Sequence, residues 1–450
     1  MDLLRDLHID GLAHGGAAVA RAADGRVVFV AGGCPGDVVT ASVTTDHGRY
    51  LEADIADITT ASPDRRTPPC PYFGHCGGCQ WQHVAYGAQA EAKRIQLADA
   101  LSRIGGVGDA LVEPTVLGES AYGYRNKLEM RAGTGADGKP VLGLTAAGSD
   151  EIVPIDACLL LPDRAKRLPK SLSGALRYLL GRAPFDLDRV ALRVARNTRD
   201  IEVALWGPPG AAPRQAIART LGDAVRTTSI TRVLVKEDPK KRADLKVEVL
   251  AGQGNWHERL GTFDYRVSSP SFFQSNTIGA AGLVSAVLER LGADGSDRVL
   301  DLFAGVGTFT LPLAAVAGEV VAIEGAGSAI RDLRVNLESA RLDAEVMPGD
   351  AARALAEAGR FDLAVVDPPR SGMAPQALRA LIDTKTRRIC YVSCDTATLA
   401  RDVKALAEAG YRLTSATPVD LFPQTWHVET LAVLERPAQT RRPTSGKSVT

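Results

Sequence analysis

The stretch VLDLFAGVGTFTLPLA, residues 299–314, decides the fold of the region around it. It opens with an apolar run that reaches Leu300 and Asp301 and predicts a strand. Gly305 and Gly307 then predict a tight turn, after which apolar residues return at helical spacing. A strand, a glycine turn and a helix in this order are typical of the first unit of a doubly wound sheet, in which a ligand lies against the turn.

An acidic residue after the next predicted strand indicates which ligand this is. VVAIEG, residues 320–325, contains Glu324 about twenty residues after the turn, where doubly wound folds place an acid on a ribose hydroxyl. A nicotinamide dehydrogenase would share this acid, but residues 308–310 (TFT) stand where the dinucleotide fingerprint requires its third glycine. We therefore favour S-adenosylmethionine as the ligand, and a purely structural unit is the alternative.

The composition is that of an ordinary globular chain. Its 450 residues are 45% hydrophobic and 24% charged, which allows two or three domains with hydrophobic cores. Lys and Arg together number 53, as do Asp and Glu, so a nucleic-acid partner would have to meet a local basic face. No apolar run of about 18 residues is present, and the charged N-terminus lacks a long apolar core. We expect a cytoplasmic protein.

Residues 1–58 predict a small β-barrel. Short apolar stretches are separated by turns, and Asp24-Gly25 between two of them predicts a hairpin. About four or five such strands in so short a segment suit a barrel of the oligonucleotide-binding kind. The pattern that runs through residues 24–30 (DGRVVFV) to residues 35–37 (PGD) resembles the TRAM domain, a small RNA-binding module attached to RNA-modifying enzymes. The resemblance implies an RNA partner, and a generic β-domain is the alternative.

Cysteines crowd into residues 70–83 (CPYFGHCGGCQWQH). The odd total of seven cysteines argues against a disulfide framework. Cys70, Cys76 and Cys79 have the spacing C-x5-C-x2-C; a zinc site would need a nearby histidine as well, and the missing second C-x2-C disfavours a zinc finger. Three close thiolates with one remote thiolate are a common arrangement for an iron–sulfur cluster. We predict Cys158 as the remote ligand, with a buried structural cysteine as the alternative.

Two further features lie between the cysteines and the last third of the chain. Residues 85–105 are amphipathic and end on glycine, which predicts a helix. Residues 122–127 (YGYRNK) are basic and aromatic and lead into a predicted strand. This patch is a candidate RNA contact, and an exposed edge strand is the alternative.

The motifs of the last third follow predicted strands. Asp367 in AVVDPPRSG and Cys394 in RICYVSCDTATLARDV stand at such strand ends, and so does Asp350. Because ligands of doubly wound sheets lie outside the carboxyl ends of the strands, we expect these residues, the segment from Asp301 to Gly307 and Glu324 around one crevice. Asp-Pro-Pro also fixes a rigid, extended backbone. Amino-group methyltransferases use a related motif whose aromatic residue stacks on the base, but Arg370 replaces that aromatic residue here.

Cys394 and Glu429 would supply what methylation of a uracil carbon needs. Carbon 5 of uracil is a poor nucleophile until a thiolate adds to carbon 6 and turns the ring into an enolate that can attack a sulfonium methyl. A base must then remove the carbon-5 proton, and Glu429 in HVETLA is the candidate. Cys394 by itself resembles a core cysteine, but beside Asp367 and the glycine turn it predicts a nucleophile.

The order of these motifs indicates a family. SFFQSN, DLFAGVGTFTLPLA, DPPRSG, YVSCDTATLARD and HVETLAVLER, after the cysteine segment and the TRAM-like start, resemble the RNA 5-methyluridine methyltransferases that carry an iron–sulfur cluster. The resemblance covers about residues 5–436 and implies Cys394 as nucleophile and Glu429 as base. It implies four cofactor contacts: Gln274, Phe303, Glu324 and Asp367. It also implies a four-iron four-sulfur cluster, structural or RNA-binding in role, on four cysteines: Cys70, Cys76, Cys79 and Cys158.

The branch of this family with the cluster and the TRAM domain is similar to enzymes that act on large-subunit ribosomal RNA. We therefore expect 23S ribosomal RNA as the substrate, ahead of transfer RNA, and we expect the enzyme to be a monomer. Two other classes remain open: a catalytically silent RNA-binding protein and an amino-group methyltransferase. Neither would need Cys394 and Glu429 together.

These features predict an α/β protein in three parts. We expect an oligonucleotide-binding-like TRAM barrel at residues 1–58 and a central α+β domain with the iron–sulfur cysteines at residues 59–262. A Rossmann-like class I methyltransferase domain should follow at residues 263–437, and the polar, cationic residues 438–450 should form a disordered tail.

Overall fold

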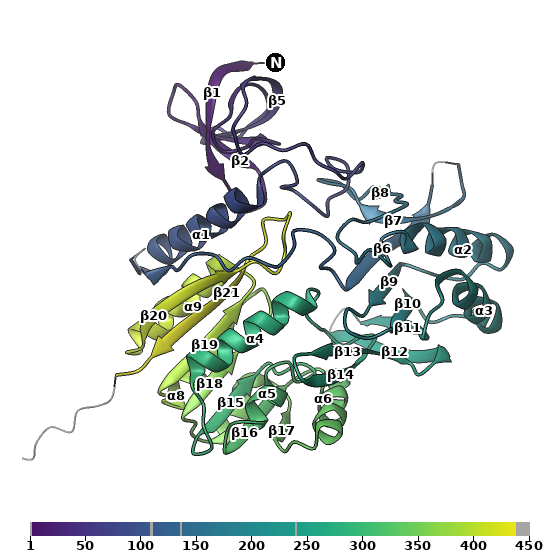
Figure 1. Ribbon diagram of the computed structural model, residues 1–450, viewed down its shortest axis with the longest axis vertical. Helices are drawn as coiled ribbons and strands as arrows, with labels where there is room; N and C mark the ends of the chain where they lie inside the picture. The colour runs from purple at the N-terminus through teal and green to yellow at the C-terminus, as the bar shows by residue number, and fades with distance from the viewer. Residues whose placement is uncertain (1, 109–110, 136, 239–240, 438–450) are drawn as a thin grey trace, which may run out of the picture.

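The computed structural model of the chain describes residues 2–108, 111–135, 137–238 and 241–437 (Figure 1). The tail predicted at residues 438–450 lies outside the described residues. In Figure 1 the N-terminal strands form a separate body at one end, and two larger sheets with their helices lie below it. Within the described residues no helix combines the length and the apolar character that a membrane crossing requires.

The N-terminal strands close into a barrel because alternate side chains along them are apolar and turn inward. Leu7 and Ile9 of β1 and Val28 and Val30 of β3 are buried in its core. The predicted hairpin at Asp24-Gly25 is confirmed, since it joins β2 to β3. The strand order is β1-β2-β3-β5-β4, with only β3 and β5 parallel among these described strands. The strands are β1 (Leu3–Leu12), β2 (Ala18–Arg21), β3 (Val27–Ala31), β4 (Val38–Asp46) and β5 (Tyr50–Thr60).

The helix α1 (Tyr86–Arg103) packs on both the barrel and the last sheet of the chain, which confirms the helix predicted at residues 85–105. Ala92 contributes to the core of the barrel. Leu97 and Leu101, further along the helix, are fully buried against the last sheet of the chain. In Figure 1 α1 runs from the barrel alongside β20 and α9. This helix therefore fixes the barrel against the part of the molecule that carries the predicted nucleophile.

The central region is built on a mixed sheet with the order β12-β11-β10-β9-β6-β7-β8. One face of this sheet packs against α2 (Leu168–Arg182) and α3 (Arg214–Val225), so that Leu192 and Val203 are fully buried. The strands are β6 (Lys127–Thr134), β7 (Pro140–Thr145), β8 (Ile152–Val153), β9 (Arg189–Val194), β10 (Ile201–Gly207), β11 (Ser229–Asp238) and β12 (Lys241–Gly252). A small antiparallel sheet of β13 (Asn255–Leu260) and β14 (Phe263–Ser268) leads into the last region.

The last region is a doubly wound sheet with the order β17-β16-β15-β18-β19-β21-β20. The strands β17 to β19 in this order are parallel, and β21 runs antiparallel to both of its neighbours. The central strands are buried over nearly their whole length, as expected where helices cover both faces. The strands are β15 (Arg298–Leu302), β16 (Glu319–Glu324), β17 (Glu345–Pro348), β18 (Leu363–Val366), β19 (Arg388–Ser393), β20 (Arg412–Val419) and β21 (Glu429–Glu435).

Helices form a hydrophobic core on each face of this sheet. One core contains side chains of α4, α5 and α6 together with β13 and β14, and the other contains side chains of α1, α7, α8 and α9. The helices of this region are α4 (Thr277–Leu291), α5 (Thr310–Ala314), α6 (Gly327–Ala340), α7 (Ala351–Ala358), α8 (Pro375–Asp383) and α9 (Thr396–Glu408). With both faces covered, ligands can reach the sheet only at its ends.

Candidate active site

The glycine turn after β15 has the backbone conformation that the sequence predicts. Gly307 has φ of +98°, and a Cβ there would lie 2.6 Å from the side chains of Leu311 and Leu333. Phe303, which is not a glycine, also has a positive φ of +68°. Its backbone N–H and that of Ala304 both donate to the carbonyl of Ile323 on β16. The turn is therefore fixed by packing and by the neighbouring strand.

Glu324 at the end of β16 holds the same turn. Its carboxylate accepts hydrogen bonds from the backbone N–H of Gly305 at 2.9 Å and of Ala326 at 2.6 Å. Asp301 lies fully buried nearby, and its Oδ2 accepts a hydrogen bond from the hydroxyl of Thr310 at 2.5 Å, while Oδ1 has no partner. Removal from water raises the pKa of Asp301 to about 7. Asp301 thus supports the turn from within the core.

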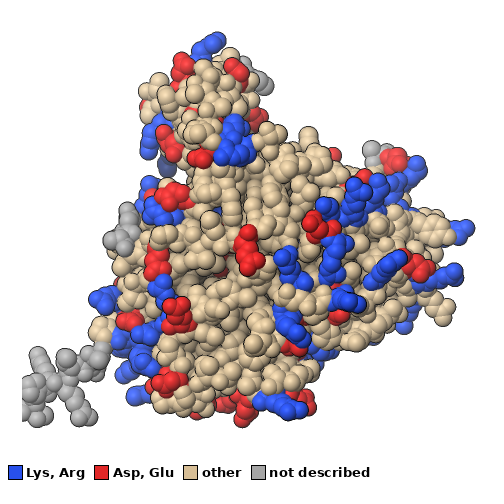
Figure 2. All heavy atoms as spheres, in the orientation of Figure 1, with Lys and Arg blue, Asp and Glu red and all other residues tan. Residues whose placement is uncertain are grey.

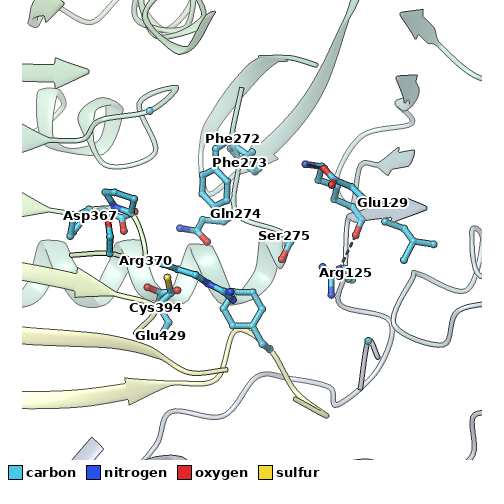
Figure 3. A pocket seen from close by; sticks show the side chains of 18 of the residues that line it. Arg125, Glu129, Phe272, Phe273, Gln274, Ser275, Asp367, Arg370, Cys394 and Glu429 are labelled. Carbon is cyan, nitrogen blue, oxygen red and sulfur yellow. Dashed lines mark hydrogen bonds and ion pairs between the residues drawn. The ribbon is translucent and has the colours of Figure 1, made fainter. Parts of the chain in front are cut away.

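Cys394 and Glu429 face each other because of strand register. β19 and β21 are antiparallel, with Ser393 opposite Thr430, so the next positions along the two chains are Cys394 and Glu429. Cys394 directly precedes α9, whose first turn is capped by Asp395 through the N–H of Thr398. Figure 3 shows four labelled side chains gathered on one side of the cavity: Asp367, Arg370, Cys394 and Glu429.

The electrostatics of this group raise the pKa of both Cys394 and Glu429. Burial raises the pKa of Cys394 to about 11; Glu429 and Asp367 raise it further, while the charge and a hydrogen bond of Arg370 oppose the rise. Burial, with the repulsion of Asp367, raises the pKa of Glu429 well above its usual range. Asp367 has its own pKa raised to about 7 by loss of water and by Asp301. Arg370 is the cation of this group.

A second wall comes from the segment between β14 and α4. Gln274 is nearly buried, and Figure 3 shows its side chain turned toward the group around Cys394. Its backbone carbonyl accepts a hydrogen bond from the side chain of Asn126 at 2.9 Å, and the N–H of Asn126 donates to Ser275. Asn276 caps α4 and also donates to Leu421. Hydrogen bonds from the central region and to the β20–β21 loop therefore hold this segment in place.

A single large cavity joins these parts. Its volume is about 1490 Å³, enough for a nucleoside-sized cofactor and a flipped nucleotide together. The predicted site residues all line it: Gln274, Phe303, Glu324, Asp367, Cys394 and Glu429, and the four cysteines Cys70, Cys76, Cys79 and Cys158. Asp350 lines it as well, whereas Asp301 lies beneath it. The expectation that the strand ends share one crevice therefore holds for Gly305, Glu324, Asp350, Asp367 and Cys394 and is wrong for Asp301, which lies in the core.

The four cysteines converge but are not arranged around one metal ion. The pKa of Cys79 is raised to about 12, mainly by burial and further by Cys158, Cys76 and Cys70, which places these thiols near one another. In the described part of the chain, no three His, Cys, Asp or Glu side chains form a group that could hold a metal ion. This argues against a compact single-ion zinc site, and it does not confirm the predicted iron–sulfur cluster.

Two contributors were not predicted as site residues. Arg370 was noted only because it replaces an aromatic residue, although its place after a strand end already put it in the crevice. Its guanidinium lies 3.1 Å from Nδ1 and 3.2 Å from Nε2 of His427, in the loop between β20 and β21. No sequence signal marks His427 as a partner of Arg370, because the two are 57 residues apart.

Comparison with known proteins identifies the family of this chain. Residues 213–437 match the family described as tRNA (Uracil-5-)-methyltransferase, and residues 5–56 match the TRAM domain. An uncharacterized RNA methyltransferase of Gloeobacter violaceus is 37% identical over 445 residues, 95% of each chain. The chain belongs to the RNA uracil-5-methyltransferase family. The TRAM domain and the methyltransferase fold predicted from the sequence are thereby confirmed, and the two rival classes are set aside.

Other members of the uracil-5-methyltransferase family match along nearly their whole length. The 23S rRNA (uracil(1939)-C(5))-methyltransferase RlmD of Chromohalobacter salexigens is 34% identical, with 98% of this chain and 91% of that protein covered. The crystal structure of Pyrococcus abyssi tRNA (uracil-54, C5)-methyltransferase in complex with S-adenosyl-L-homocysteine is similar with a TM-score of 0.73 and 27% identity, covering 95% of this chain and 99% of that chain. The chain is an S-adenosylmethionine-dependent RNA uracil-5-methyltransferase.

Proposed function

We propose that this enzyme methylates carbon 5 of a uridine in 23S ribosomal RNA, with Cys394 as nucleophile and Glu429 as base. The observation that carries the chemistry is the register of β19 and β21, which sets Cys394 opposite Glu429 at the cavity. The RNA class is supported by the similarity to the 23S rRNA enzyme at 34% identity, against 27% for the transfer-RNA enzyme. Transfer RNA is the second candidate.

In the first half of the cycle the sulfur of Cys394 adds to carbon 6 of the uracil. A bond forms between sulfur and carbon 6, and the electrons of the carbon 5–carbon 6 double bond move toward the carbonyl at carbon 4 to give an enolate. With its pKa raised to about 11, the thiol of Cys394 needs help to ionise. The Arg370 guanidinium gives that help, because a cation that donates to the sulfur favours the thiolate.

In the second half carbon 5 takes the methyl group, and Glu429 removes the carbon-5 proton. The electrons of that C–H bond restore the double bond and expel the sulfur of Cys394 as a thiolate, while Glu429 holds the proton. The enzyme returns to its starting state when this proton passes to the thiolate, and the proton that the thiol released to solvent in the first half is the net proton product. A carboxylate with a raised pKa is a stronger base than an ordinary one, which suits the burial of Glu429. S-adenosylmethionine supplies the methyl group as an electrophile attached to a sulfonium sulfur.

The residues that line the cavity fit this cofactor. Glu324 lies at the turn where a ribose hydroxyl could replace one of its backbone partners, and Phe303 presents its ring from a strained backbone position. Gln274 and Asp367 line the same cavity near Cys394, where polar groups would orient the cationic end of the cofactor. Asp367 suits a positively charged cofactor because a nearby cation favours the ionised carboxylate.

The surface around the cavity supports an RNA substrate. Figure 2 shows Lys and Arg side chains gathered over the central region on the face displayed. Arg125 and Lys127, from the patch singled out in the sequence, line the cavity, and the TRAM domain adds a second RNA-binding module. A chain with no net charge thus offers phosphate a local basic face. We propose that the enzyme meets its RNA in the cytoplasm.

We also propose that Cys70, Cys76, Cys79 and Cys158 hold a four-iron four-sulfur cluster with a structural or RNA-binding role. Each thiolate of such a cluster binds a different iron, so the sulfurs need not surround one ion. The spacing and convergence of the four thiols support this assignment. Metal and sulfide analysis of anaerobically prepared protein should find iron with matching sulfide, and Cys158→Ala should lower both. Stoichiometric zinc without sulfide would contradict the proposal.

A methyl-transfer assay tests the choice of RNA. Fragments of 23S ribosomal RNA and unmodified transfer RNA are incubated separately with labelled S-adenosylmethionine, and the product nucleosides are identified. We expect 5-methyluridine in the ribosomal fragment and none in transfer RNA. Methylation of transfer RNA alone would contradict the choice of ribosomal RNA and support transfer RNA as the substrate. Cys394→Ala serves as the control that the label arrives through this site.

A further inference from the structure

The loop between β1 and β2 of the barrel lies against the loop between β20 and β21. The carbonyl of Gly16 in this loop accepts a hydrogen bond from the indole N–H of Trp81 at 3.0 Å. A Cβ on Gly16 would lie 2.8 Å from Gln80 and 3.3 Å from the ring of Trp426. Trp426 also packs against the hydrophobic core of the barrel. The barrel and the β20–β21 loop are thus in close contact.

A chain of ring contacts leads from this loop to the nucleophile. The ring of His14 meets the ring of Trp426 edge-on, with centroids 4.2 Å apart. Trp426 lies on His427 with centroids 3.8 Å apart, and the ring of His427 holds the guanidinium of Arg370. Arg370 in turn faces Cys394. His14 is therefore three side-chain contacts away from the group that stabilises the thiolate.

His427 is suited to hold Arg370 because its ring is neutral. Burial, together with the charge of Arg370, lowers the pKa of His427 to about 4. A neutral imidazole keeps one unprotonated nitrogen, which can accept a hydrogen bond from the guanidinium. A protonated ring could not accept and would repel Arg370.

Contacts with α1 fix the rest of the β20–β21 loop. Asp420 forms an ion pair with Lys93 of α1 at 2.6 Å, and both side chains are fully buried. The backbone N–H of Gln424 donates to Gln89, also on α1, at 2.9 Å. His14, whose side chain is 51% exposed, is therefore the contact that can be removed without opening the core.

We propose that the barrel is part of the catalytic machinery: His14 is a positioning residue that, through Trp426 and His427, holds Arg370 against Cys394. This inference rests on the proposed role of Cys394. According to this proposal, the TRAM barrel affects the rate of the chemical step as well as the affinity for RNA. The ring of His14 packs on Trp426, and its Nε2 also lies 3.9 Å from Oδ2 of Asp395, the neighbour of Cys394. We assign the effect to the ring, and His14→Phe separates the two contacts because it keeps the ring and removes the nitrogen.

Three variants test this proposal. His14→Ala removes the ring, and His14→Phe keeps an aromatic ring of similar size. His47→Ala is the matched control, since His47 is a barrel histidine that stacks on Tyr50 within the barrel, with centroids 4.4 Å apart. For each protein we would measure the dissociation constant for RNA and the rate of a single round of methylation at saturating RNA and cofactor.

A second readout needs neither RNA nor turnover. The rate of alkylation of Cys394 by iodoacetamide is followed against pH by mass spectrometry of its peptide. The charged or titratable groups that face this thiol are Arg370, Glu429 and Asp367. If Arg370 moves away in His14→Ala, the alkylation profile should shift to higher pH while the other two groups stay in place.

We expect His14→Ala to slow the single methylation round about tenfold, as small displacements near a reacting group do, with RNA affinity changed far less. The alkylation profile should shift with it, whereas His14→Phe and His47→Ala should resemble the unaltered protein in both readouts. An unchanged rate and profile in His14→Ala would overturn the proposal, as would a loss of RNA affinity alone. It would also fail if His14→Phe were as slow as His14→Ala. Failure of the nucleophile assignment would show separately, as turnover by Cys394→Ala.

Discussion

At the scale of single residues, the site brings together two side chains that act in different halves of one cycle. Cys394 forms the bond to the ring before methyl transfer, and Glu429 acts only after it. Cys394 follows one strand of an antiparallel pair, and Glu429 begins the other. Variants of the two residues should therefore stop the reaction at different steps.

Cys394→Ala should neither methylate RNA nor form a covalent complex with it. Glu429→Gln should add Cys394 to the target uridine and accept the methyl group, and then stall, because the carbon-5 proton stays in place. Denaturing gels with a labelled methyl donor should show a protein–RNA band for Glu429→Gln and none for Cys394→Ala. Normal turnover by Cys394→Ala would exclude the assigned nucleophile, and normal turnover by Glu429→Gln would require another base.

The buried carboxyl of Asp301 should make stability depend on pH. Its pKa rises from an ordinary 3.8 to about 7 on folding, so its contribution is fully present below pH 4 and is lost as the pH rises toward 7. Asp301→Asn should then raise the free energy of unfolding at pH 8 by about 4 kcal/mol and change it little at pH 4. Urea denaturation at the two pH values measures this. An equal effect at both would mean that Asp301 is ionised in the folded protein.

At the scale of elements, the turn after β15 contains two glycines with different requirements. Gly305 has a positive φ but open space where a Cβ would point, whereas Gly307 has no room for one. The G-x-G spacing shows that a turn occurs here, and the packing of Leu311 and Leu333 shows which glycine is indispensable. The two positions thus form a natural pair for comparison.

Gly305→Ala should cost only the strain of a left-handed residue, about 1–2 kcal/mol of unfolding free energy. Gly307→Ala should cost more than this, because a Cβ 2.6 Å from two leucine side chains forces the turn to move. Thermal unfolding would measure the stability of both, and calorimetry their affinity for S-adenosylmethionine. Equal losses in the two variants would show that the turn relaxes freely around Gly307.

The elements also show how far the sequence could be interpreted. The β2–β3 hairpin, α1 and the strand–turn–helix at Gly307 carry local signals in turn residues and periodicity, and the structure contains all three. The pairing of β21 between β19 and β20 carries no such signal, since strand order depends on packing far along the chain. The contacts between His14 and Trp426 and between Arg370 and His427 were missed for the same reason. The roles of Cys394 and Glu429 and the domain boundaries stay predictions.

At the scale of the whole molecule, α1 packs on the barrel and on the last sheet, and a buried ion pair between Lys93 and Asp420 ties it to the β20–β21 loop. Burial lowers the pKa of Lys93 and raises that of Asp420, so the loss of water outweighs their attraction. Asp420 Oδ2 also has no hydrogen-bond partner. The pair is therefore expected to fix geometry more than to add stability.

Lys93→Met should destabilise the protein by about 3–5 kcal/mol, because it leaves the buried charge of Asp420 without its cation and with the backbone N–H of Phe422 as a remaining donor. The double variant Lys93→Met with Asp420→Leu should recover most of that loss. Denaturant titration of the two single variants and the double variant measures the coupling. If the double variant were as unstable as the sum of the single variants, the two side chains would act independently and the ion pair would not account for the loss.

The position of β21 has a consequence for folding. It follows β20 in the chain but lies between β19 and β20 in the sheet, antiparallel to both. β20 pairs with β21 and not with β19, so β20 can take its place in the sheet only together with or after β21. Glu429 opens β21, and His427 lies in the hairpin loop. A molecule in which β20 and β21 have not yet paired can therefore form the turn after β15 and expose Cys394 at the free edge of β19. It lacks Glu429 as the base and His427 as the partner of Arg370 until these strands complete the sheet.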